Sequence, residues 1–354
     1  MYFQMKSTNT KMRDFNHPFS ELLKNYLTFE YEHNLNGGAR DYNRASDIGK
    51  DFYTLYHKRI GTPYTNHPTP EGLGKMMAGN VFHLFIQDKF DQMGILKSKE
   101  QSVEIPELKV KGRYDLRVGG IVDYEQELNK TDSLDIPDFL KRVRVSWLEG
   151  MRSEFGHSIP EYMADIKSVS SFMFERMEID GWAPQEHHAL QQTTYWIGAG
   201  RPDIPQLIFY LCRDDFRMQV VEFDPEDYEW RVNHFWQTLN DIVVEGKEPE
   251  KEEPVIYDEQ GFASLNWKCL YSPYLTMMTG LKTKEDFKEK YEPEIKEHNK
   301  ALQDKLDWEA IQKEFKGASK KDLAEIIENG KYDNPNFGRT KRARLIKRLI
   351  EEVK

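Results

Sequence analysis

The order of helical and strand-like patterns constrains this fold more than any other feature of the sequence. A helical spacing of apolar residues over Leu73–Met93 precedes three strand-like segments, and a second helical pattern, Gln185–Gly198, precedes two more. Strands interleaved with helices in this way predict an α/β fold with a mixed central sheet flanked by helices. The expected strands are Ser102–Ile105, Lys109–Val118, Tyr162–Lys167, Gln206–Leu211 and Met218–Phe223.

Helical additions are expected at both ends of this core. Apolar spacing predicts helices over residues 15–36 and 45–59, and Ser46 is a plausible N-cap for the second. In the C-terminal part, Ser319 and Asp322 have the spacing of a helix start. The expected organisation is an N-terminal helical region at 6–78, a core at 79–279 with a largely polar insertion at 119–160, and a charged helical module at 280–354, while residues 1–5 resemble the remainder of a cleavable tag and are excluded.

The composition excludes membrane-spanning and disulfide-rich classes of protein but does not indicate what the protein binds. No run approaches the roughly 18–20 apolar residues that a membrane span needs, so we expect a soluble intracellular protein. Cys212 and Cys269 are too few for a disulfide framework. A net charge of −10 does not indicate nucleic acid, yet acidic nucleases are reasonable because bound divalent cations neutralise clustered carboxylates.

Two short motifs carry the chemistry that the sequence suggests. Lys111-Gly-Arg-Tyr-Asp115 and Ala164-Asp-Ile-Lys167 each place an aspartate at or near the end of an expected strand. Strand alternation puts Asp165 and Lys167 on one face and turns Ile166 to the other. Two neighbouring carboxylates repel unless a cation lies between them, and hard oxygen ligands suit Mg²⁺ or Mn²⁺. Lys167 could then orient an attacking water or stabilise charge on a phosphate.

Three further residues complete an ordered set. His83 lies in the expected helix before both motifs, and Gln191 and Tyr195 share one face of the later helix at i and i+4. Taken singly, each of these features is more often structural than functional, and an Asp-x-Lys on a strand is common. Their order along the chain is a helical His, then Gly-x-x-Asp, Asp-x-Lys and Gln-x-x-x-Tyr.

Over residues 44–275 this ordered set resembles the RecB-like branch of the PD-(D/E)XK nuclease superfamily, which includes phage exonucleases and CRISPR adaptation nucleases. The resemblance implies a restriction-endonuclease-like core in which His83, Asp115, Asp165 and the carbonyl of Ile166 bind metal. It also implies that Lys167 is the catalytic lysine. Gln191 and Tyr195 would arrange the active site around DNA, and Arg113 would contact the DNA.

The same resemblance implies a metal-dependent DNA nuclease, with an exonuclease favoured over a structure-specific endonuclease. Its setting would be phage or bacterial recombination and repair, in the cytoplasm of a bacterial or phage-infected cell. A single-strand annealing protein would be a fitting partner. The alternative from another class is a catalytically silent DNA-binding scaffold, against which the intact Asp115, Asp165 and Lys167 argue.

Three segments leave alternatives open. Many relatives hold an iron–sulfur cluster, but Asp51 and Ser272 stand where cysteines are usual and Cys269 alone remains, so no cluster is expected. The basic part of the insertion could line a DNA channel or be a structural extension; its cations are Lys141, Arg142 and Arg144. The last segment has six cations in residues 339–348, which could contact DNA or complement a helix end; they include Lys341, Arg342 and Arg344.

Overall fold

In the computed structural model, the described residues are 22, 25–29, 31, 39–329 and 339–352. The chain forms two compact units, Met1–Glu250 and Lys251–Lys354. Within the helix expected at 15–36, the described residues are helical and the remainder lies outside the description, as do residues 1–5. No helix in the described part of the chain has the length and apolar character needed to cross a membrane.

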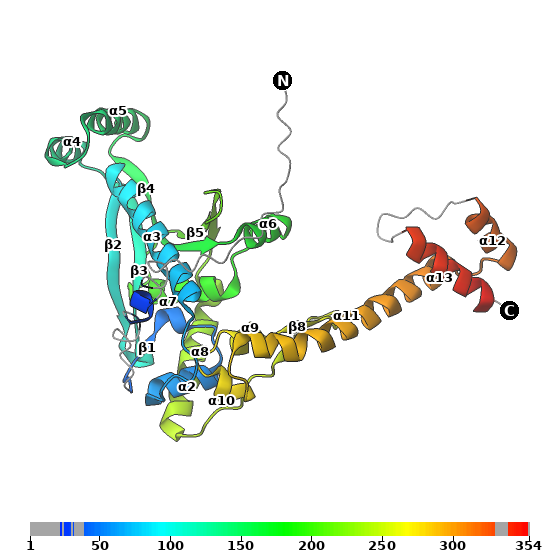
Figure 1. Ribbon diagram of the computed structural model, residues 1–354. Coiled ribbons are helices and arrows are strands. Elements are labelled where there is room, and N and C mark those ends of the chain that lie inside the picture. The colour runs from blue at the N-terminus through cyan, green and yellow to red at the C-terminus, as the bar shows by residue number, and fades with distance from the viewer. Residues whose placement is uncertain (1–21, 23–24, 30, 32–38, 330–338, 353–354) are drawn as a thin grey trace. The chain divides into compact units, whose positions relative to one another are not determined.

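The first unit is built on a six-stranded sheet of mixed direction (Figure 1). On one edge of β3, β2 runs antiparallel; on the other, β1 pairs in parallel at Val110 and Lys111, and β4 pairs antiparallel from Leu116 onwards. Next to β4 lies the parallel β5, followed by the antiparallel β6. The strands are β1 Asn43–Arg44, β2 Leu96–Ile105, β3 Val110–Ile121, β4 Ser158–Val169, β5 Gln206–Cys212 and β6 Met218–Phe223, with the 3-10 helix η2 Pro106–Leu108 between β2 and β3.

Helices cover both faces of this sheet, as β5 shows. All of β5 is buried, because its alternate side chains enter two different apolar cores. Leu207, Phe209 and Leu211 pack with α3, whereas Ile208 and Tyr210 pack on the side of α6. With α7 and α8 on that second side, the predicted α/β fold with a mixed, helix-flanked sheet is confirmed. These helices are α3 Pro70–Gln92, α6 Ser171–Ile179, α7 Glu186–Gly198 and α8 Glu226–Glu245.

The helix expected at 45–59 is interrupted, and its predicted cap is wrong. The segment forms a 3-10 helix η1, Ala45–Asp47, and then α2, Phe52–Ile60. Gly49 separates them with a φ of +81°, a left-handed conformation that ends the first helix and favours glycine. The N-cap of α2 is Asp51, whose carboxylate accepts a hydrogen bond of 2.6 Å from the Thr54 backbone N–H, so Ser46 is not the cap.

The insertion between β3 and β4 is an ordered helical hairpin (Figure 1). The two strands extend further than expected, to Ile121 and from Ser158, and between them lie α4, Tyr124–Ser133, and α5, Asp138–Phe155. Tyr124, Leu148 and Ile159 form a small core of their own under the hairpin. The insertion expected at 119–160, which the sequence marks as largely polar, is therefore largely helical.

The second unit is mainly helical. Its C-terminal helices pack through Ile311, Leu323 and Ile346. Ser319 and Asp322 form the predicted helix start as a reciprocal capping box. The expected module boundary at 279/280 lies inside this unit. Its elements are β7 Val255–Tyr257, β8 Ala263–Leu265, α9 Trp267–Leu270, α10 Leu275–Thr279, α11 Lys284–Glu314, α12 Lys320–Glu328 and α13 Arg339–Glu352.

Candidate active site

The two aspartates lie at a fork between β3 and β4. Pairing of these strands begins at Leu116 with Ala164, and Asp115 and Asp165 are the next residues on the side where the strands part. Instead of a ladder bond, the carboxylate of Asp115 accepts a 2.7 Å hydrogen bond from the Ile166 backbone N–H. Both aspartates are buried. At the fork, the Asp115 side chain on β3 takes the place of a β3 backbone carbonyl as the acceptor for β4. The two carboxylates are therefore brought together.

Lys167 connects this fork to α7. Its Nζ lies 2.6 Å from Oδ2 of Asp165 and donates to Oε1 of Gln191 over 3.0 Å. The amide of Gln191 in turn donates to the hydroxyl of Tyr195 over 2.7 Å. Asp165 and Lys167 reach the same face by strand alternation, and Gln191 and Tyr195 do so by helical spacing. Four of the residues singled out in the sequence thus form one continuous polar chain.

His83 approaches the fork from α3. Its Nδ1 lies 3.2 Å from Oδ2 of Asp115. One turn later, the buried amide of Gln87 donates to the backbone carbonyl of Asp115 and to the carboxylate of Glu100, each over 3.0 Å. Glu100 is opposite Asp115 in the β2–β3 register. Helix α3 therefore holds Asp115 at both its side chain and its backbone.

The ionisation of these groups is mutually dependent. Burial opposes charge on Asp115, but the hydrogen bond and charge of His83, the charge of Lys167 and the Ile166 N–H outweigh it and lower the pKa of Asp115. For His83, burial is likewise outweighed by Asp115 and Asp165, so the pKa of His83 is raised. Burial raises the pKa of Asp165 to about 7, with Lys167 opposing the shift and Asp115 adding to it. Without a bound cation, the site therefore favours the ionised form of Asp115, and the pKa of Asp165 lies near neutral pH.

Two residues beside the site, Tyr210 and His188, were not identified from the sequence. Tyr210, which pairs with Lys167 in register, accepts a hydrogen bond from the Gln185 backbone N–H and lies 3.1 Å from Nδ1 of His188. Burial, followed by the charge of Lys167, lowers the pKa of His188 well below its usual range, so the ring is neutral and its Nδ1 can accept a hydrogen bond from the Tyr210 hydroxyl. This contact fixes the first turn of α7 beside β5. Gln191, further along α7, reaches Lys167.

Gln87 on α3 was also not identified from the sequence, although its i+4 spacing from His83 predicts that the two side chains share one face of the helix.

The donor set is small. Among the described residues, no three His, Cys, Asp or Glu side chains are grouped closely enough to hold a metal ion by themselves. Two carboxylates remain, and Oδ2 of Asp165 is buried with no hydrogen bond beyond its ion pair to Lys167. Mg²⁺ is commonly held by one or two carboxylates, with waters and substrate phosphate completing its shell. The oxygen donors present fit a hard divalent cation of that kind.

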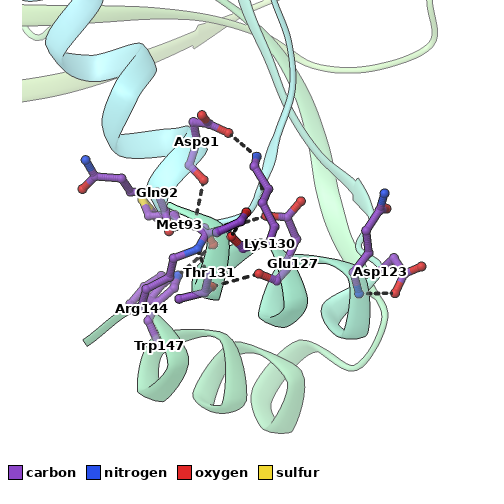
Figure 2. A network of polar contacts seen from close by, with 11 residues as sticks. Asp91, Gln92, Met93, Asp123, Glu127, Lys130, Thr131, Arg144 and Trp147 are labelled. Atoms are coloured by element: carbon purple, nitrogen blue, oxygen red, sulfur yellow. Dashed lines mark hydrogen bonds and ion pairs between the residues drawn. The ribbon is translucent and has the colours of Figure 1, made fainter. Parts of the chain in front are cut away.

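The basic residues outside the fork that were expected to contact DNA differ in their exposure and in their bonding partners. Arg113 is exposed, with its Nε 3.7 Å from Glu100, and Arg142 is exposed on α5. Lys141 donates to the Asp132 carbonyl over 3.0 Å. Arg144, in contrast, is buried and bonds within the protein, as Figure 2 shows. This environment matches the structural alternative for Arg144, because a buried guanidinium bonded to four internal acceptors is not accessible to a phosphate.

The cations of α13 are likewise divided. Lys341 forms ion pairs with Asp304 and Asp307, and the buried Arg342 pairs with Glu314. Arg344 is exposed. Much of the basic character read from the sequence is therefore neutralised within the second unit.

Both cysteines are buried and neither forms a disulfide. Cys212 is in the apolar core around β5. Cys269 donates to the backbone carbonyls of Glu252 and Glu253, at 3.4 and 3.6 Å. The surroundings of Cys269 are those of a small buried side chain with a weak donor.

Comparison with known proteins adds no functional information. No family model and no characterised protein matches the sequence. A solved structure described as that of SSO0001 is 12% identical, covers 75% of this chain and 98% of its own, and superposes with a TM-score of 0.37. A likeness at that level carries no argument about activity.

Proposed function

We propose that this protein is a metal-dependent DNA nuclease that hydrolyses phosphodiester bonds at the β3–β4 fork. The observation that carries the proposal is that the partly buried Lys167 lies with the buried Asp115 and Asp165 in one cluster. A lysine beside paired carboxylates suits phosphodiester hydrolysis, because the carboxylates can hold a cation that activates water and the ammonium can stabilise charge on the phosphate. The ordered motifs of the sequence support the same assignment.

Asp115 and Asp165 would hold Mg²⁺ or Mn²⁺, with His83 and the Ile166 carbonyl as the further expected ligands. Bound there, the cation would lower the pKa of a coordinated water and offset charge on the phosphate. The His83 imidazole, hydrogen bonded to Asp115, would keep that carboxylate ionised and oriented, since the shift in its pKa favours the charged form.

Lys167 would position the attacking water and stabilise negative charge on the phosphate. Its ammonium is held from two sides, by Asp165 and by the Gln191 amide, and Tyr195 fixes the other end of that amide. A donor that is fixed before substrate arrives needs no reorganisation during the reaction. Most of the electrostatic stabilisation of the transition state arises from this preorganisation. Gln191 and Tyr195 are therefore positioning residues in this proposal.

The decisive experiment is cleavage of labelled DNA with Mg²⁺ or Mn²⁺. Lys167→Ala should lower the rate by about 100-fold or more while leaving DNA affinity largely intact. Lys247→Ala, at an exposed lysine after α8, is the matched control and should cleave like the wild type. A wild type that does not cleave with either metal would leave the silent DNA-binding scaffold. A Lys167→Ala variant as fast as a cleaving wild type would remove Lys167 from the proposed reaction.

An exonuclease acting from DNA ends is the preferred form of this activity, on the strength of the sequence resemblance. Linear DNA labelled at its 5′ or 3′ end should then be degraded, while a closed circle is spared. Cutting of the circle would instead identify an endonuclease. The single-strand annealing partner and the bacterial cytoplasm remain predictions of the same resemblance.

A further inference from the structure

We propose that the outer face of α5 is a self-association surface, on which a second copy of this chain docks its own α5 in the antiparallel direction. The surface is an open groove of about 1020 Å³, lined by α5 and by Met93 at the end of α3. Four large apolar side chains along this face are 41–61% exposed: Phe139, Val143, Trp147 and Phe155. A continuous exposed apolar surface of this kind marks an interaction site on a protein that otherwise buries its apolar residues.

The groove is rigidly supported from beneath, as the contacts in Figure 2 show. Buried Arg144 donates from α5 to Thr131 on α4, to the carboxylate of Glu127 and to the carbonyls of Asp91 and Gln92 at the end of α3. The indole N–H of Trp147 donates to the Met93 carbonyl over 3.2 Å. Because the face is already ordered, docking would require little further loss of conformational entropy.

The spacing of the apolar residues makes the face complementary to itself. Phe139, Val143, Trp147, Met151 and Phe155 recur every fourth residue and are symmetric about Trp147. In an antiparallel pair, each end of this row would meet the opposite end in the second copy. Rows of this spacing form the ridges that interdigitate in the commonest class of helix packing. Gly150, which also lines the groove, has no atom within 4 Å of a Cβ built on it, leaving room for a side chain of the other helix.

The charges on α5 favour the same partner and orientation. Arg142 and Glu154 line opposite ends of the groove, and neither forms an ion pair within the described residues. Antiparallel docking about Trp147 would place Glu154 of each copy two residues, about 3 Å along the helix axis, from the position facing Arg142 of the other. These two long side chains can span that offset, so one two-fold axis would create two ion pairs. With Arg144 paired internally, the remaining charges of α5 balance, which disfavours phosphate as the occupant; they are Lys141, Arg142 and Arg152 against Asp138, Glu149 and Glu154.

The oligomeric state of the full chain tests this proposal. Sedimentation across the micromolar range should show a dimer that Val143→Glu shifts to monomer, raising the dissociation constant by about tenfold or more. Val244→Glu is the matched control, because Val244 is 77% exposed on α8 and lies outside the groove, and it should leave the dimer unchanged. Far-ultraviolet circular dichroism should be the same for all three proteins.

A charge exchange tests the orientation. Arg142→Glu alone should weaken association, and combining it with Glu154→Arg should restore it, because the two substitutions recreate opposite charges across the pair. A wild type that stays monomeric throughout the concentration range overturns the proposal. If Val143→Glu then also reduces DNA affinity, the groove would be assigned to nucleic acid instead. A dimer that tolerates Val143→Glu, or that the double exchange does not restore, overturns the interface or its direction.

Discussion

Asp165 carries a carboxyl group whose pKa is strongly raised by burial in this fold. Its pKa rises from an ordinary 3.8 to about 7 on folding, so between those values the folded chain keeps a proton that the unfolded chain has lost. The stability that this proton confers is complete below the unfolded pKa and disappears as pH rises through the folded pKa. Above that point, folding must place an ionised, fully buried carboxylate next to Asp115.

We therefore predict that Asp165→Asn stabilises the metal-free protein more at pH 8 than at pH 5, with a difference between the two pH values on the order of 1–3 kcal/mol. The amide removes the buried negative charge, and Lys167 keeps its contact with Gln191. Denaturant titration with a chelator present measures the difference at both pH values. Adding Mg²⁺ should stabilise the wild type and not the variant if Asp165 is a ligand of the proposed metal site. An equal response to Mg²⁺ in both would remove Asp165 from that proposal.

At this scale, the sequence predicts residues whose relation is local and misses those that meet only through tertiary structure. Strand alternation was enough to join Asp165 with Lys167, and helical spacing was enough to join Gln191 with Tyr195. His188 and Tyr210, in contrast, lie 22 residues apart on different elements. No periodicity connects them, and a tyrosine in an otherwise apolar strand reads as an ordinary core residue.

Among the elements, the α4–α5 hairpin differs most from its sequence-based description. A basic stretch with interleaved apolar residues is compatible with a DNA channel and with a helix that buries one face. The structure has the helix, and it buries Arg144 against α3 and α4. Which cation of the stretch is internal could not be known beforehand, because the acceptors belong to Asp91 and Gln92, more than 50 residues earlier.

We predict that Arg144→Met loosens this hairpin without disturbing the fork. Removing the guanidinium leaves Glu127 with only the more distant Lys130, at 4.0 Å, and takes one donor from the Asp91 and Gln92 carbonyls. Since Glu127 is partly exposed, the cost should lie below the roughly 3–5 kcal/mol typical of breaking a fully buried ion pair. Amide hydrogen exchange should therefore accelerate across 124–155 and stay unchanged in β4 and α7. Arg152→Met, at an exposed arginine of the same helix, is the control. Unchanged exchange in the hairpin would show that its apolar core alone anchors it.

At the scale of the whole molecule, the distribution of charge determines how an acidic protein could bind DNA. The chain has a net charge of −10, and residues 339–348 contain its densest group of cations. Lys341 and Arg342 are committed to acidic partners on α11, and Arg348 lies over the ring of Trp308, 4.3 Å from its centroid. A count of charges along the sequence therefore overstates the cations that a phosphate backbone could reach.

This division leads to a prediction about the salt dependence of DNA binding. Each phosphate contact adds about 0.7–0.9 to the slope of log affinity against log salt, because it releases a condensed counterion. Arg344→Gln should lower the slope by about that amount, since Arg344 is exposed and forms no ion pair among the described residues. Arg342→Gln should leave the slope unchanged and instead destabilise the second unit, because it leaves Glu314 without its partner. Fluorescence anisotropy over a salt series measures both slopes, and equal slopes for wild type and Arg344→Gln would exclude this helix from DNA binding.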